Sequence, residues 1–206
     1  MAFSDRIPDP LPTCNNSVDV VFIVDATGSI DYSNFMKTLD YIRDICLSLS
    51  IDSGWVRIGL MTYSDQPHVV FTLKDYATTA AIRAAISNAS YIGSSSNIAG
   101  ALESLRTTMF TEANGDRLNV TNVAVFFTSA RSRDPAATQQ QADLARRAGI
   151  SIIVVALGNW LDMDEIKAIA SYPNENTVFP KSFDALQPST AQPIINQICQ
   201  SKFIRI

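Results

Sequence analysis

The sequence predicts an α/β fold with a mostly parallel sheet and helices on both of its faces. Apolar and largely β-branched runs such as Val18–Val24 and Ile150–Leu157 are typical of strands buried on both faces. These runs alternate along the chain with segments whose apolar residues recur at helical spacing. Such alternation is the pattern of βαβ units.

The strands are predicted from short apolar runs that turn residues separate. The link between the second and third runs, Ser64–Pro67, is very short. A link of this length joins antiparallel neighbours, so the third strand is expected to form an edge of the sheet. Strands are expected over 18–24, 56–63, 68–73, 122–128, 150–157 and 178–179.

The helices are predicted from apolar residues three or four positions apart. Phe35, Leu39 and Ile42 share one face of the first helix. Asp134 followed by Pro135 is typical of a helix N-cap with proline at the first helical position. Helices are expected over 33–49, 78–88, 98–109, 163–170 and 191–199 and from 135 up to Gly149, and 111–119 is expected to be an exposed polar connection.

Composition and charge exclude several classes of function. The 206 residues are 47% hydrophobic and 17% charged, as in a soluble domain with a buried core. No apolar run approaches the roughly 18 residues of a membrane-spanning helix. The formal charge of −4, without a Lys/Arg cluster, argues against nucleic acid or acidic membranes as partners. The only histidine, His68, follows Pro67 on the expected edge strand and argues against histidine-dependent hydrolysis.

The three cysteines give evidence about the redox compartment in which the protein occurs. Cys14 and Cys199 lie near the two ends of the expected fold, and domain termini are often close in space. A disulfide between them would stabilise the fold by roughly 4–5 kcal/mol in the chain-entropy model. The alternative is two unrelated thiols in a cytosolic protein. Cys46 is expected to be a small buried apolar residue of the first helix.

Further features favour an extracellular setting. Three Asn-x-Ser/Thr triplets begin at Asn15, Asn88 and Asn119, which favours a secreted glycoprotein only mildly. The first residues contain no basic segment followed by an apolar one, so a mature or excised domain and a cytosolic protein both remain open. The terminal cysteines favour the first of these.

Three polar loops are expected at the carboxyl edge of the sheet, where open α/β sheets bind ligands. They are Asp25–Ser29, Ser94–Asn97 and Ser129–Ser132. One carboxylate and several hydroxyls would meet there, and such oxygen ligands suit a hard cation such as Mg²⁺. The same residue types are also ordinary turn formers.

Several blocks of the sequence, in order and with suitable gaps, resemble the von Willebrand factor type A domain. The resemblance covers about residues 17–199, preceded by an extended leader at 1–16 and followed by a tail at 200–206. It implies a doubly wound six-stranded sheet of order 3-2-1-4-5-6, with the third strand as the antiparallel edge. The blocks are 18–30 with Phe35, 56–65, 97–102, 123–128, 149–152, 166–171, 178–179 and Phe183.

In this family a metal-ion-dependent adhesion site uses the pattern Asp-x-Ser-x-Ser, a threonine from a second loop and an aspartate from a third. Asp25 and Ser29 match the turn, and Thr27 keeps a hydroxyl where serine is usual. Ser96 takes the place of the threonine, and Ser129 stands where the aspartate is expected. The family's second carboxylate is therefore absent.

The missing carboxylate leaves two outcomes open. The degenerate site either binds Mg²⁺ weakly with help from a partner's carboxylate, or it has lost the metal and the domain binds partners through ordinary contacts. We favour the second outcome and expect no cofactor. Asp134 lies near enough in sequence to swing toward the site, although helix capping is its expected role.

Arg131 lies in the third loop and Arg133 directly follows it, and both are candidate partner-binding residues. They are either part of a solvated helix face or a basic rim that receives an acidic partner. The sequence thus predicts a non-enzymatic extracellular module for adhesion or matrix interaction that binds a protein ligand, with neither nucleic acid nor membrane as partner. The alternative is a cation-regulated adhesion switch that binds Mg²⁺ at Asp25, Thr27, Ser29 and Ser96.

Overall fold

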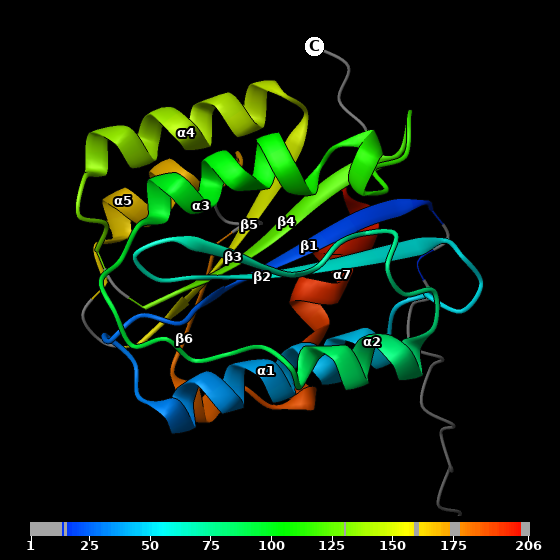
Figure 1. Cartoon of the computed structure of the whole chain (residues 1–206), viewed down its shortest axis with the longest axis horizontal. Coiled ribbons are helices and arrows are strands. Elements are labelled where there is room, and N and C mark those ends of the chain that lie inside the picture. The colour runs from blue at the N-terminus through cyan, green and yellow to red at the C-terminus, as the bar shows by residue number, and fades with distance from the viewer. Residues whose placement is uncertain (1–13, 15, 130, 159–160, 174–177, 203–206) are drawn as a thin grey trace, which may run out of the picture.

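The computed structural model describes residues 14, 16–129, 131–158, 161–173 and 178–202. Six strands form one sheet of order β3-β2-β1-β4-β5-β6, in which β3 runs antiparallel to β2 and the other neighbours are parallel (Figure 1). The predicted fold class is confirmed. The strands are β1 (Val18–Asp25), β2 (Val56–Tyr63), β3 (Pro67–Phe71), β4 (Thr121–Thr128), β5 (Ile150–Leu157) and β6 (Val178–Lys181).

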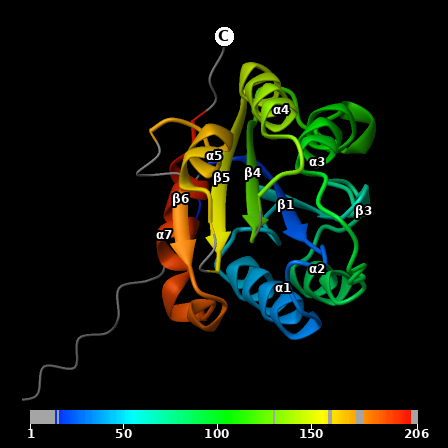
Figure 2. The same cartoon turned by 90° about the vertical axis from the view of Figure 1, so that its left-hand side faces the viewer.

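Helices cover both faces of the sheet, as Figure 2 shows from the side. Alternate residues of β1 face opposite layers: Val20 and Phe22 belong to one apolar cluster, whereas Val21 and Ile23 belong to the other. This explains why β1 reads as a continuous apolar run. The first cluster includes α1 (Tyr32–Leu47), α2 (Thr79–Ile86) and α7 (Gln192–Gln200), and the second includes α3 (Ile98–Ser104), α4 (Pro135–Arg147) and α5 (Met163–Ile169).

The helix expected over 98–109 changes character at Leu105. The α-helix α3 ends at Ser104, and Leu105–Met109 form one π-helical turn in which the amide of Phe110 donates to the carbonyl of Leu105. The wider turn lets both Met109 and Phe110 face the core, where they are 0% and 7% exposed. The regular α-helical spacing in the sequence predicted a core-facing position for Met109 but not for Phe110.

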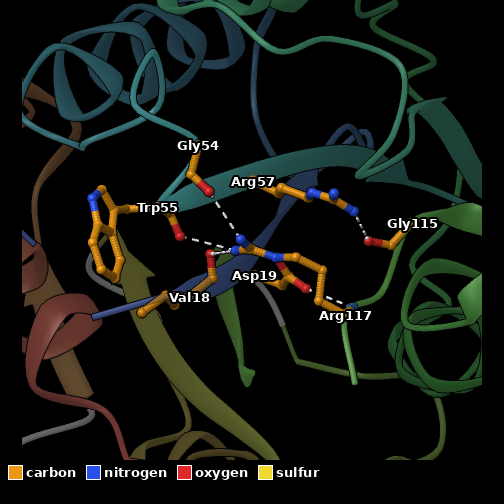
Figure 3. Close-up of polar contacts among 7 residues, drawn as sticks. All are labelled: Val18, Asp19, Gly54, Trp55, Arg57, Gly115 and Arg117. Carbon is orange, nitrogen blue, oxygen red and sulfur yellow. Dashed lines mark hydrogen bonds and ion pairs between the residues drawn. The ribbon is translucent and has the colours of Figure 1, made fainter. Parts of the chain in front are cut away.

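The connection at 111–119 is not simply an exposed loop, which corrects the sequence-based expectation. It contains a 3₁₀ turn, Glu112–Asn114, and then places Arg117 against β1 (Figure 3). The Arg117 guanidinium and backbone amide both donate to the fully buried Asp19 carboxylate, at 2.8 Å each. The same guanidinium donates to three backbone carbonyls, those of Val18, Gly54 and Trp55.

The expected disulfide joins Cys14, which precedes β1, to Cys199 in the last turn of α7. Cys46 is a free, fully buried thiol, as predicted, and burial raises its pKa to about 12. Most of the expected leader at 1–16 and of the tail at 200–206 lies outside the described residues. Among the helices that the structure describes, none has the length and apolar character to cross a membrane.

Candidate functional site

Asp25 is the last residue of β1 and lies at the centre of the predicted site. Its side chain is 2% exposed, because β1 is a central strand and loops cover its end. The amide of Thr27 donates to Asp25 Oδ1 at 2.9 Å. The amide and hydroxyl of Ser129 donate to Asp25 Oδ2 at 3.1 and 2.7 Å. The first and third loops are therefore joined through this carboxylate.

The hydroxyls continue this network toward solvent. Thr27 Oγ1 and Ser29 Oγ are 2.5 Å apart, and Ser29 Oγ and Ser129 Oγ are 3.1 Å apart. Thr27 is buried, whereas Ser29 is exposed. The structure thus brings together four of the five predicted site residues in one oxygen-rich cluster.

A buried tyrosine from β2 lies close to this cluster. The Tyr63 hydroxyl donates to Thr128 Oγ1 at 3.1 Å, and the ring stacks on Phe126 at a centroid distance of 5.3 Å. Burial, together with the negative charge of Asp25, raises the pKa of Tyr63 well above its ordinary value. Tyr63 is therefore a neutral hydrogen-bond donor at physiological pH.

The second loop lies against the first through backbone contacts. The amide of Gly28 donates to the carbonyl of Ser94 at 2.7 Å, and the amide of Gly93 donates to the carbonyl of Ala26 at 2.9 Å. A Cβ on Gly28 would lie 2.9 Å from the carbonyl oxygen of Gly93, so only glycine permits this approach. Ser64, which the sequence did not single out, accepts from the amide of Ser94 and donates to the carbonyl of Ser95.

Ser96 is the predicted residue that does not join the cluster. Its Oγ is buried and has no hydrogen-bond partner among the described residues. It lines a separate hollow between the start of α3 and the start of α4, together with Ser132, Arg133 and Thr138.

The third loop continues from Ser129 into α4. Arg131 pairs with Asp162 at 3.1 Å, and Arg133 Nη1 donates to Ser95 Oγ at 3.2 Å. Asp134 caps α4 by accepting from the amide of Ala137, which confirms its predicted capping role.

Glu165, in the first turn of α5, is a second carboxylate near this loop that the sequence analysis did not single out. Its two oxygens accept from the amide of Ser132 at 3.1 and 3.3 Å. No local sequence signal marks this contact, because the two residues are 33 positions apart.

The cluster fits a hard cation in ligand type and spacing, but not in charge. All its donors are oxygens, and neighbouring ligands of an octahedral Mg²⁺ are about 2.9 Å apart, close to the hydroxyl spacings here. Asp25 alone supplies negative charge, so one positive charge of a divalent ion is left unbalanced. Among the described residues, no group of three or more His, Cys, Asp or Glu side chains is arranged to hold a metal.

Among its described residues, the site contains no Ser-His-Asp arrangement. His68 is exposed on the edge strand β3. Ser129 donates directly to a carboxylate and has no histidine to act as its base.

Comparison with known proteins shows a match to one domain family. A sequence model of the von Willebrand factor type A domain matches residues 19–192. The collagen alpha-4(VI) chain of Mus musculus is 29% identical over 194 residues, which are 92% of this chain and 8% of the relative. Matrilin-2 of Mus musculus is 27% identical over 187 residues, which are 89% of this chain and 19% of the relative. The chain thus spans less than a fifth of each of these relatives.

Solved structures share the fold. Proximal thread matrix protein 1 from the mussel byssus superimposes with a TM-score of 0.83 at 22% sequence identity, covering 90% of this chain and 49% of that chain. Another structure of the same mussel protein, described as having a zinc-occupied MIDAS motif, has a TM-score of 0.83 at 21% identity, with the same coverage of the two chains. By the match of the family model over most of its length, and by its fold, this chain belongs to the von Willebrand factor type A domain family.

Proposed function

We propose that residues 17–199 form a non-enzymatic protein-binding module that acts in an extracellular matrix or adhesion setting. The binding surface, here called the loop face, consists of Asp25–Ser29, Ser94–Asn97 and Ser129–Ser132, with Arg131 and Arg133 at its rim. The relatives named above include a collagen chain and a matrilin, which supports the matrix setting. The Cys14–Cys199 disulfide supports an oxidising compartment.

The observation that carries this proposal is the fixed contact between the first and third loops at the carboxyl edge of the sheet. Ser129 donates twice to Asp25 across 104 positions of sequence. Buried strands hold both ends of this contact, so Asp25 and Ser129 are positioned before any partner arrives. A preformed surface loses little conformational freedom on binding.

We regard the metal site as degenerate. Affinity for a divalent cation follows the charge of its ligands, and the loop face offers one carboxylate. The second candidate function is a cation-regulated switch, in which Asp25, Thr27, Ser29 and Ser96 would hold Mg²⁺ and the ion would attract an acidic side chain of the partner. The zinc-occupied motif of the mussel protein favours this second candidate.

The proposal is tested by retention of the chain on immobilised extracellular matrix extract. Ser29→Tyr places a bulky ring on the exposed loop face, and we expect at least a tenfold loss of retention. Leu118→Tyr is the matched control, because Leu118 is 80% exposed just before β4, at the opposite end of the sheet. This control should retain wild-type binding.

The metal is tested in the same assay. EDTA should leave retention unchanged if the degenerate site needs no ion, whereas a loss that Mg²⁺ restores would establish the switch instead. Equal retention of wild type and Ser29→Tyr would contradict binding through the loop face.

A further inference from the structure

A hollow of about 370 Å³ lies beside the loop face, between the first turns of α3 and α4. Its wall includes Ser96 and Asn97 from the second loop, Ser132 and Arg133 from the third loop, and Thr138 from α4. This volume is within the range of small-ligand pockets. Neither the oxygen cluster at Asp25 nor the family resemblance assigns it a role.

Two hydroxyl groups in this wall are almost fully buried and lack partners. Ser132 is 9% exposed and Thr138 is 1% exposed, and neither hydroxyl has a hydrogen-bond partner among the described residues. The buried Ser96 hydroxyl, in the same wall, has none either. Buried polar groups are nearly always paired, so these three hydroxyls retain the capacity to form a hydrogen bond.

Arg133 supplies the charge at this hollow. Its side chain is exposed, and one guanidinium nitrogen donates to Ser95 Oγ. Arg133 forms no ion pair within the described part of the chain, in contrast to Arg131, which pairs with Asp162. Among the described residues of the wall, Asp134 is the carboxylate, and its charge is opposed by the amide end of α4 that it caps. The Glu165 carboxylate lies next to the wall, where it accepts from the amide of Ser132.

We propose that this hollow receives the carboxylate side chain of an acidic segment in a protein partner. Arg133 would form the charge-assisted hydrogen bond, and Ser132 and Thr138 would donate their unpaired hydroxyls to the same group. The inference rests on the proposed protein-binding function and names the chemistry of the partner. It places the partner's acidic group on an arginine rather than on a metal.

The ligand reaches the hydroxyls by side-chain rotation. Each hydroxyl oxygen has less than 1 Å² of accessible area in the structure. Serine and threonine have three staggered side-chain rotamers, and in the proposed complex a rotation about χ1 would turn the hydroxyls toward the hollow.

The test is an NMR titration of the whole, disulfide-bonded chain with the peptide acetyl-Gly-Glu-Gly-amide. We expect saturable shifts in the amide signals of Ser132, Arg133 and the first turn of α4. The peptide with Gln in place of Glu should bind at least tenfold more weakly, because it lacks the charge. Shifts confined to the Asp25 turn, or equal binding of the two peptides, would overturn the proposal, as would the absence of shifts at 20 mM peptide.

Three variants localise the effect. Arg133→Gln should weaken binding of the Glu peptide at least tenfold, whereas Arg147→Gln, a control at the exposed far end of α4, should change it less than twofold. Thr138→Val removes an unpaired hydroxyl and keeps the shape, so it should weaken binding several-fold without lowering the urea midpoint. Ser132→Ala gives the same readout if the valine variant folds poorly. Equal effects of the two arginine variants would contradict the role of the hollow.

Failure of this inference is distinguishable from failure of the proposed function. If matrix retention is lost in Ser29→Tyr but is unchanged in Arg133→Gln and Thr138→Val, the loop face binds protein and the hollow takes no part. If the wild-type chain is not retained at all, the proposed function itself is wrong.

Discussion

Asp19 is a fully buried carboxylate whose charge is matched by a single arginine. Removal of one member of a buried ion pair is costly, because the remaining charge has lost both water and its partner. Arg117 also ties β1 to the chain around Gly54 and Trp55, at the end of the sheet opposite to the loop face. This network therefore positions the start of β1.

Asp19→Ala is expected to lower the free energy of unfolding by about 3–5 kcal/mol. Urea denaturation followed by circular dichroism measures this change. Asp40→Ala is the control, since Asp40 pairs with Arg43 on the surface and exposed pairs contribute about 1 kcal/mol or less. Similar losses in both variants would show that the buried ion pair contributes no more to stability than the surface pair does.

Two buried groups cause the stability of the fold to decrease at alkaline pH. Burial raises the pKa of the Cys46 thiol to about 12 and raises the pKa of Tyr63 well above 10.0. In the unfolded chain these groups ionise near their ordinary values, while the folded chain keeps their protons. The unfolded state then binds fewer protons, so stability is complete below pH of about 9 and falls as pH rises toward 12.

The measurement is a series of urea midpoints between pH 8 and pH 10. Cys46→Ala should flatten the decline between pH 9 and pH 10, because the tyrosines begin to ionise only near the upper limit. An unchanged slope would mean that the thiol is not protected by burial.

At the scale of the elements, caps and loops hold the binding surface. α4 begins next to both the oxygen cluster and the hollow, and its start is fixed by Asp134 and Pro135. A change in this cap alters helix stability and leaves the ligands of the oxygen cluster untouched.

Asp134→Ala should therefore destabilise the protein by about 1 kcal/mol, and Asp134→Asn, which retains the cap, by much less. Thermal unfolding measures both variants. In a calorimetric Mg²⁺ titration, neither variant should differ from wild type, because the Asp134 carboxylate is engaged at the helix. A weaker Mg²⁺ affinity in Asp134→Asn would instead place that carboxylate at the metal.

Local patterns predicted most elements of this fold from the sequence. The apolar run of β5, the cap at Asp134 and the short link before β3 depend on neighbouring residues, and all three are confirmed. The π-helical turn after α3 was not predictable, because the apolar spacing of this segment fits a regular α-helix; in the structure Met109 lies against Gly59 of β2.

The proximity of four candidate site residues was also predictable from the sequence. Asp25, Thr27, Ser29 and Ser129 meet because parallel strands end at one edge, which topology alone dictates. The contact of Glu165 with Ser132 and the pairing of Asp19 with Arg117 join distant segments. Such contacts leave no periodic or spacing signal in a single sequence.

At the scale of the whole molecule, the two ends of the sheet carry different structures. The loop face lies at the carboxyl ends of the parallel strands. The disulfide lies at the other end, where Cys14 precedes β1 and Cys199 ends α7, with the two Cα atoms 4.9 Å apart. The bridge encloses nearly the whole fold, with a sequence separation of 185.

Reduction of this bridge is expected to destabilise the fold by about 5 kcal/mol in the chain-entropy model. Urea midpoints with and without a reducing agent measure the loss. A thiol assay on the unfolded protein should find one free cysteine before reduction and three after it, given the three cysteines in the sequence. Three free thiols before reduction would contradict the bridge.

Because Cys14 and Cys199 are covalently joined, a mechanical load applied to the segments outside them passes directly from one sulfur to the other. The sheet between them is bypassed and is not stretched. A partner bound to the proposed loop face, at the other end of the sheet, would then remain on an undistorted surface.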